Sequence, residues 1–259
     1  MTMSRRTFVS ASLGLVASGA VGASASGAAA PAWAVETAAP TRGSTRHHEV
    51  IGSSTRGRAI HAYRLGAAGA ASTFVVLGQM HGDELAGWAL SRHMLLPATV
   101  PDGVQFWVIP TMNPDGRIAG TRTNARGVDL NRNFPSSDWS HQGVGTSTYS
   151  GPRPGSEPET RAVRRFLNRL GPFTVVSLHQ PFGVVDYSGG DPAVTRWLGG
   201  HLGLPTKRLG TSGGNLTKWF NQTWPKHTAV TLELPRPATP EFRRTTARVL
   251  VHFSAVRRR

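Results

Sequence analysis

The chain contains no cysteine, and this absence excludes disulfide bonds, thiolate catalysis and thiolate metal ligands. Acidic residues are also scarce, with 14 Asp and Glu against 29 Lys and Arg. Beyond the first 34 residues, no apolar run approaches the length that spans a membrane. Any metal bound by this chain must therefore be held by His, Asp or Glu.

The formal charge of +15 falls to +13 when Arg5 and Arg6 are removed. Such a balance favours anionic partners, namely nucleic acid, anionic lipid or the acidic polymers of a bacterial wall. The basic residues are scattered, however, and no zinc-finger or RNA-binding sheet motif is present. We interpret the surplus as a solvated cationic surface and expect no nucleic-acid partner.

Residues 1–34 have the features of an export signal. Arg5 and Arg6 precede a moderately apolar stretch, and Ala32–Trp33–Ala34 has the small-x-small form of a cleavage site. The arginine pair in SRRTF is typical of the bacterial twin-arginine route. We expect cleavage near Ala34, a flexible lead over residues 35–45 and a single domain over residues 46–259. We also expect a secreted, extracytoplasmic protein with no stable membrane insertion.

The rest of the chain predicts an α/β fold with a mixed, mainly parallel central sheet and helices on both faces. A hairpin is expected over residues 46–66, and four apolar runs have the composition of strands covered on both faces: 73–79, 105–112, 174–179 and 228–235. Helices are expected between and after them: 85–96, 156–170, 191–203 and 240–256.

Three helix starts carry capping signals. Ser156 and Glu159 have capping-box spacing, and Asp191 and Thr239 precede the next two predicted helix starts. Residues 113–155 show no periodicity, and a loop of that length inside a compact domain is usually functional.

The segment QMHGDE places His81 and Glu84 three residues apart, directly after an apolar run. Alone, this spacing of a histidine and a glutamate is as typical of a polar turn as of a metal site. His179 ends another apolar run, TVVSLH, and should emerge at the same rim of a parallel sheet. Two histidines and a glutamate with a fourth position free form a catalytic zinc arrangement, so the three residues predict a Zn²⁺ site.

Glu233 lies within the apolar run TAVTLELP, where a carboxylate is costly unless it is paired or functional. It is either half of a buried Glu–Arg pair or a general base. In the central loop, Asn131 and Arg132 are candidates for binding a substrate carboxylate, and Arg122 for stabilising an oxyanion. We assign Arg117 and Arg126 to a solvated basic surface.

The motifs HGDE, NPDGR, RTNARGVDLNRNF, SLH and TLELP, in this order, resemble the zinc carboxypeptidase family (peptidase family M14) over nearly all of residues 46–250. The resemblance implies that one zinc ion per chain is bound by three residues: His81, Glu84 and His179. It also implies that Glu233 is the general base and that Arg122 polarises the scissile carbonyl. Asn131 and Arg132 would then hold the terminal carboxylate of a peptide substrate.

The compact chain is most similar to the bacterial murein peptide amidase branch, which cuts the γ-D-glutamyl–diaminopimelate bond of cell-wall peptides. The mobile tyrosine of the digestive enzymes has no counterpart before TLELP, so Trp219 or another residue is expected to line the pocket. Lys218 and Arg208 are candidates for contacting a second substrate carboxylate.

Three alternatives remain open at this point. The chain could be a general metallocarboxypeptidase that removes C-terminal amino acids. A deacylase of the succinylglutamate desuccinylase and aspartoacylase type shares H-x-x-E and an Arg/Asn pair, but the export signal and the GVDLNRNFP form argue against it. A non-catalytic protein that binds cell wall or polyanions would retain the fold with a broken ligand set, whereas all four acidic and histidine positions are present here.

Overall fold

The computed structural model describes residues 46–96, 100–172, 174–210 and 212–256. The predicted export signal and the predicted lead lie outside these residues. Within the described ranges, no helix has both the length and the apolar character needed to cross a membrane.

The central element is an eight-stranded sheet with the order β1-β2-β4-β3-β5-β8-β6-β7. Its strands are β1 (His47–Ser53), β2 (Ala59–Leu65), β3 (Ser72–Leu77), β4 (Val104–Ile109), β5 (Thr174–His179), β6 (Phe182–Asp186), β7 (Thr206–Lys207) and β8 (Thr228–Pro235). The pairs β3–β4, β3–β5, β5–β8 and β6–β7 are parallel, and the pairs β1–β2, β2–β4 and β6–β8 are antiparallel. The prediction of a mixed, mainly parallel sheet is confirmed.

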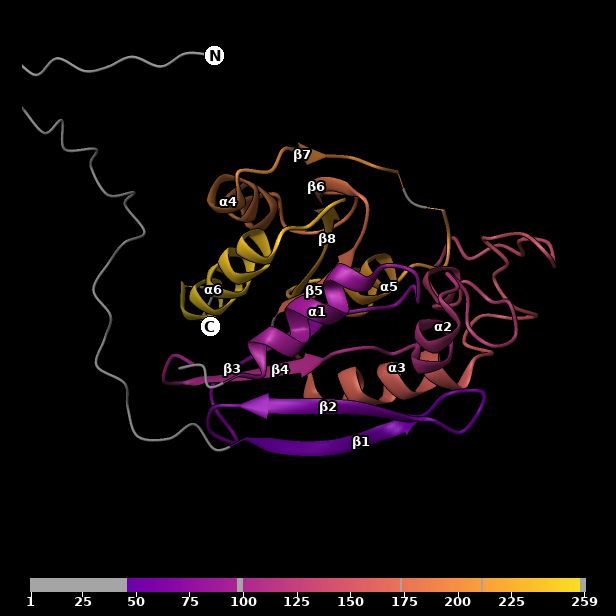
Figure 1. The fold of residues 1–259 in the computed structure, drawn as a ribbon, viewed down its shortest axis with the longest axis horizontal. Helices are drawn as coiled ribbons and strands as arrows, with labels where there is room; N and C mark the ends of the chain where they lie inside the picture. Colours follow the sequence, from indigo (N-terminus) through magenta and orange to yellow (C-terminus); the bar gives the residue numbers. More distant parts are fainter. Residues whose placement is uncertain (1–45, 97–99, 173, 211, 257–259) are drawn as a thin grey trace, which may run out of the picture. The chain divides into compact units, whose positions relative to one another are not determined.

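Helices cover both faces of the sheet (Figure 1). One face packs against α1 (Leu85–Met94), α4 (Pro192–Leu202) and α6 (Pro240–Val256). The other packs against α3 (Pro158–Leu170) and α5 (Leu216–Thr223). Burying a Leu, Ile or Phe side chain completely stabilises the folded state by roughly 1.5–3 kcal/mol. Each face of the sheet has an apolar core of such side chains, and these two cores fix the positions of the central strands.

The predicted hairpin, four strands and four helices are all present, with boundaries shifted by a few residues. Two capping predictions are confirmed: the Asp191 side chain accepts a hydrogen bond from Ala193 N at 2.8 Å, and Thr239 Oγ1 accepts one from Phe242 N at 3.1 Å.

The capping-box prediction at Ser156 is wrong. Pro158 forces an extended conformation on the residue before it, so helix α3 begins at Pro158 with Glu157 at the N-cap. Ser156 Oγ donates to Glu157 Oε1 at 2.7 Å, and the buried Glu159 accepts from Thr55 N at 2.7 Å.

Residues 113–155 are less irregular than predicted. They contain helix α2 (Pro114–Ala119) and a 3₁₀ turn, η1 (Leu130–Arg132). Asn113 caps α2 by accepting from Gly116 N at 2.9 Å, and Asp129 caps η1 by accepting from Asn131 N at 2.8 Å. These two turns position the basic residues of the loop.

Candidate active site

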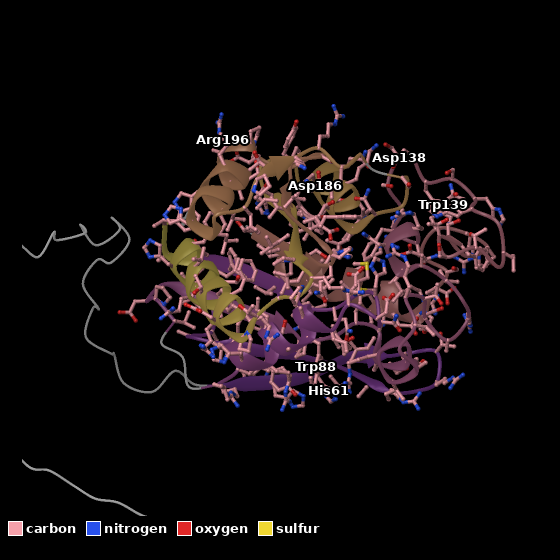
Figure 2. All side chains as sticks on the ribbon, turned by 45° about the horizontal axis from the view of Figure 1, so that its top comes forward. His61, Trp88, Asp138, Trp139, Asp186 and Arg196 are labelled. Atoms are coloured by element: carbon pink, nitrogen blue, oxygen red, sulfur yellow. The ribbon has the colours of Figure 1, made fainter. Side chains whose placement is uncertain are left out.

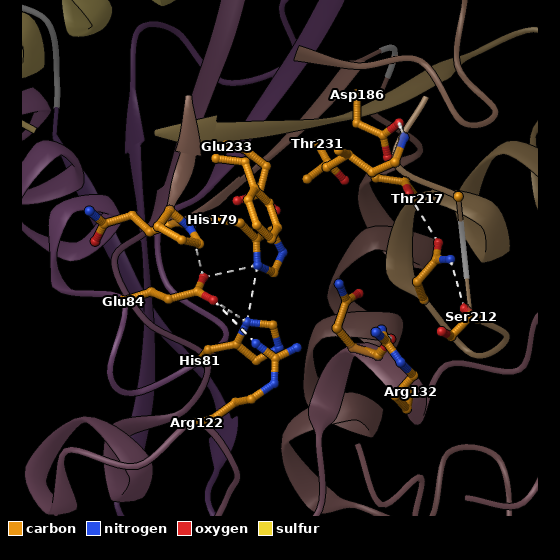
Figure 3. Close-up of a pocket in the computed structure, with 17 residues that line it drawn as sticks. His81, Glu84, Arg122, Arg132, His179, Asp186, Ser212, Thr217, Thr231 and Glu233 are labelled. Atoms are coloured by element: carbon orange, nitrogen blue, oxygen red, sulfur yellow. Dashed lines mark hydrogen bonds and ion pairs between the residues drawn. The ribbon is translucent and has the colours of Figure 1, made fainter. Parts of the chain in front are cut away.

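Three neighbouring parallel strands deliver the predicted site residues to one edge of the sheet. His81 and Glu84 lie between β3 and α1, His179 is the last residue of β5, and Glu233 of β8 is its partner in register. Because β3, β5 and β8 run in the same direction, their carboxyl ends open on the same cavity. Figure 3 shows His81, Glu84 and His179 converging on one wall of it.

Two glycines allow this convergence. A Cβ at Gly82 would lie 2.0 Å from the carbonyl carbon of Gly116, and a Cβ at Gly87 would lie 1.8 Å from Gly78 O. No other residue type permits these backbone approaches. The segment that carries His81 and Glu84 is therefore held directly against α2 and the end of β3.

The geometry of the three candidate ligands fits a zinc ion. One ligand atom from each of His81, Glu84 and His179 lies within 4.8 Å of the others, and all three side chains are buried. The two Nδ1 atoms are 3.2 Å apart, and Glu84 oxygens lie 2.8 Å from His81 Nδ1 and 3.1 Å from His179 Nδ1. Ligand atoms ~2.0–2.1 Å from a tetrahedral Zn²⁺ are separated by about 3.3 Å, so these separations suit the ion.

Asp129 connects the candidate ligand His81 to Arg122. Its Oδ1 lies 2.9 Å from His81 Nε2, and its Oδ2 accepts from Arg122 Nη2 at 2.9 Å. Burial lowers the pKa of His81, but the carboxylates of Asp129 and Glu84 outweigh it and raise that pKa to about 9. The same negative charges favour a cation at the ligand atoms. A carboxylate on the second ring nitrogen also orients the imidazole of a metal-binding histidine.

Glu233 lines the cavity without a cationic partner. Its side chain is 8% exposed, its Oε2 has no hydrogen-bond partner, and burial raises its pKa. No ion pair joins Glu233 to a basic residue in the described ranges, so the alternative of a buried Glu–Arg pair is excluded there. A buried oxygen without a partner suits a group that binds water or substrate.

Asn131 and Arg132 line the same cavity, which has a volume of about 370 Å³. Asn131 Oδ1 accepts from Leu216 N at 3.1 Å, which leaves its amide group as a donor. Arg132 Nη1 donates to Asn131 O at 2.8 Å, whereas its buried Nε has no partner. These free donors are suited to a carboxylate.

Asp186, at the end of β6, also lines the cavity and was not predicted from the sequence. Asp186 is 8% exposed and lines the cavity beside Thr231 (Figure 3). Its Oδ1 accepts from Ser188 N at 2.9 Å and from Leu209 N at 3.2 Å, while Oδ2 accepts no hydrogen bond from a described residue. A usable signal was present, because Asp186 follows the apolar residues GVV as a strand-terminal carboxylate.

Three residues named as candidates for the cavity wall do not line it, and in place of Trp219 the cavity has other residues, such as Phe182. Trp219 does not line the cavity; it is 4% exposed and packs in the core against Phe134, with ring centroids 5.4 Å apart. Lys218 Nζ donates to Asp138 Oδ2 at 2.6 Å, and neither Lys218 nor Arg208 is among the described lining residues. Figure 2 shows Asp138 among the outer loops, near Trp139.

Arg117 and Arg126 also lie outside the cavity. Arg117 stacks over the Trp88 ring at 4.6 Å from its centroid, and the side chain of Arg126 is 56% exposed. The expectation of surface positions for both is consistent with these contacts.

Comparison with known proteins shows which family the chain belongs to. A family model described as zinc carboxypeptidase matches residues 33–196, which is more than half of the chain. The chain belongs to the zinc carboxypeptidase family. The predicted family is thus confirmed, and the family is one of hydrolases. The match includes all three candidate zinc ligands and ends before Glu233.

Two curated relatives within the family are murein peptide amidases A. The Escherichia coli K12 protein is 34% identical over 167 residues, which span 58% of this chain and 64% of that protein. The Vibrio campbellii protein is 32% identical over 177 residues, which span 62% of this chain and 68% of that protein. The chain therefore matches slightly less than two thirds of the length of the Escherichia coli relative.

Solved structures show the same fold. The crystal structure of murein-tripeptide amidase from Escherichia coli O157 has a TM-score of 0.68 and 26% identity, covering 83% of this chain and 96% of that chain. The carboxypeptidase A of Helicoverpa armigera has a TM-score of 0.69 at 18% identity, covering 83% and 69% of the two chains. The second similarity concerns the fold alone.

Proposed function

We propose that the chain is a zinc-dependent peptide amidase that hydrolyses the γ-D-glutamyl–diaminopimelate bond of murein peptides. The observation that carries the proposal is the convergence, in one cavity, of the ligand set, an unpaired Glu233 and the free donors of Asn131 and Arg132. The murein peptide amidases among the relatives support the choice of substrate.

His81, Glu84 and His179 would hold the zinc ion, which supplies a Lewis acid that lowers the pKa of water and polarises a carbonyl. Glu233 accepts the proton of the attacking water and returns it to the leaving nitrogen. Arg122 is held by Asp129 at the cavity edge and stabilises the negative charge that develops on the carbonyl oxygen. Asn131 and Arg132 bind the carboxylate of the leaving residue, so the enzyme trims an end of the peptide.

Asp186 supports diaminopimelate as the leaving residue. It is a buried carboxylate in a strongly basic chain, yet it forms no ion pair with a described residue. Hydrogen bonds hold Oδ1 of this carboxylate, but no cation balances its charge among the described residues, and a substrate ammonium group would supply one. Diaminopimelate carries such an ammonium group at the far end of its side chain, whereas Phe or Glu does not.

The test is a comparison of two γ-D-glutamyl dipeptides, one ending in diaminopimelate and one in 2-aminopimelate, which lacks only the second amine. We expect wild type to prefer diaminopimelate by about 10- to 100-fold in kcat/KM, as for a hydrogen bond to a charged group. Asp186→Asn should abolish this preference, while Asp138→Asn should leave it intact. Equal rates on both dipeptides, or preference for ordinary peptides ending in Phe, would contradict the assignment and favour a general carboxypeptidase.

We propose an extracytoplasmic location for the chain, which the predicted twin-arginine signal over residues 1–34 supports. The cationic surface of the chain is compatible with an anionic wall.

A further inference from the structure

A second pocket adjoins the candidate active site at Arg122. It has a volume of about 540 Å³ and is lined by residues from two segments, 122–127 and 144–149. Arg122 is the one described residue that lines both this pocket and the catalytic cavity. We call it the Arg126 pocket, because Arg126 is its second basic side chain.

The position of Arg122 determines what the Arg126 pocket can accept. If Arg122 contacts the scissile carbonyl, the two parts of a substrate diverge from that point. The leaving residue occupies the cavity with Arg132 and Asp186. The acyl residue then has the neighbouring pocket available, because Arg122 lines both pockets.

The Arg126 pocket has the chemistry of an anion site. Its charged lining residues are Arg122 and Arg126, and the other described side chains are neutral, including the hydroxyls of Thr123, Ser147 and Tyr149. The Arg126 guanidinium donates no hydrogen bond to a described residue. Its one acidic neighbour, Glu157, is 3.6 Å away and already accepts hydrogen bonds from Asn124 and Ser156.

The backbone around the Arg126 pocket is fixed before substrate binds. Asn124 Oδ1 accepts from both Arg126 N and Val128 N at 3.0 Å, and Asn124 is itself buried. On the other wall, Tyr149 O accepts from the backbone N–H of Asp129 at 2.8 Å. Asp129 also holds His81 and Arg122, so both walls connect directly to the catalytic residues.

We infer that the Arg126 pocket binds the acyl side of the substrate and that Arg126 recognises a carboxylate there. A γ-linked glutamyl residue carries its free α-carboxylate a few bonds from the scissile carbonyl, whereas an acyl residue with a neutral side chain has no carboxylate at this point. Arg126 thereby selects acyl residues that carry this carboxylate over neutral acyl residues. This inference rests on the proposed function and adds the determinant of its acyl-side specificity.

The experiment uses the zinc-loaded chain and two peptides that differ in one group. One is γ-D-glutamyl-diaminopimelate, and the other has the glutamyl α-carboxylate replaced by the isosteric carboxamide. Wild type, Arg126→Met and the control Arg153→Met are compared in kcat/KM, with zinc content and melting temperature measured for each. Arg153 is an exposed arginine of the same loop that lines neither pocket.

We expect wild type and Arg153→Met to prefer the carboxylate peptide by about 10- to 100-fold. Arg126→Met should lose that preference by slowing on the carboxylate peptide alone, with an unchanged rate on the carboxamide. Equal rates of wild type on the two peptides, or an equal loss on both in Arg126→Met, would overturn the inference while leaving the amidase activity intact. Turnover of neither peptide by wild type would refute the proposed function and this inference with it.

Discussion

Two polar atoms in the catalytic cavity, Glu233 Oε2 and Arg132 Nε, are buried and have no partner among the described residues. Both belong to residues that the motifs singled out, and both lie where a substrate amide and its carboxylate would be bound. Buried polar groups of folded proteins are almost always satisfied, so unsatisfied ones that share a cavity indicate a ligand.

Among single substitutions, Glu233→Gln tests the role of Glu233 as general base most directly. The amide keeps the volume of the side chain and cannot accept a proton, so we expect kcat to fall by about 10²- to 10⁴-fold. Zinc content, measured by mass spectrometry, should stay at the wild-type level. The control Glu241→Gln, at an exposed site in α6, should leave both unchanged. Normal turnover in Glu233→Gln would refute its role as the general base.

At the scale of single elements, the connection from β3 to α1 depends on glycine. Gly82→Ala would place a methyl group against the backbone of Gly116, and the loop would have to move. We expect a loss of about 1–3 kcal/mol in the free energy of unfolding, together with weaker zinc binding. Chemical denaturation and zinc titration measure the two effects.

The matched control is Gly200→Ala, within helix α4, where an added Cβ meets nothing within 4 Å. It should be neutral or raise the free energy of unfolding by up to ~1 kcal/mol, because alanine is the better helix former. Equal stability and zinc affinity of Gly82→Ala and wild type would show that the loop does not depend on this contact.

The helices and strands that could be predicted from the sequence are those with a long, regular pattern of apolar residues. Continuous apolar runs specify β3, β4, β5 and β8, and these strands position His179 and Glu233 at one edge of the sheet. Short elements carried too little signal: β7 has 2 residues and α2 has 6, including a glycine. The missed strand β6 is the reason that Asp186 was overlooked.

The wall of the cavity could not be predicted, because its side chains are oriented by contacts between distant segments. Lys218 and Trp219 occupy neighbouring positions in α5, yet one binds Asp138 and the other enters the core. The sequence shows which residues are near the catalytic strand, but the direction of each side chain depends on how α5 packs against the sheet.

At the scale of the whole molecule, the net charge of +15 and the few acidic residues are compatible with the proposed cell-wall substrate, which is anionic. The proposed function, together with the arginine pair near the N-terminus, predicts export. Expression of the full chain in a bacterium with a twin-arginine route should yield a secreted form whose N-terminus, read by mass spectrometry, follows Ala34. Replacing both Arg5 and Arg6 by Lys should retain the chain in the cytoplasm, and unchanged secretion of that variant would contradict this route.

The most direct test of the account is the metal content of the mature chain, measured by mass spectrometry for wild type and His179→Ala. Two imidazoles and a carboxylate should bind about one zinc ion per chain in wild type, and the variant should lose it. Wild-type protein that carries no metal and takes up none on addition of zinc would contradict it. His81, Glu84 and His179 would then be a buried polar cluster without catalytic function.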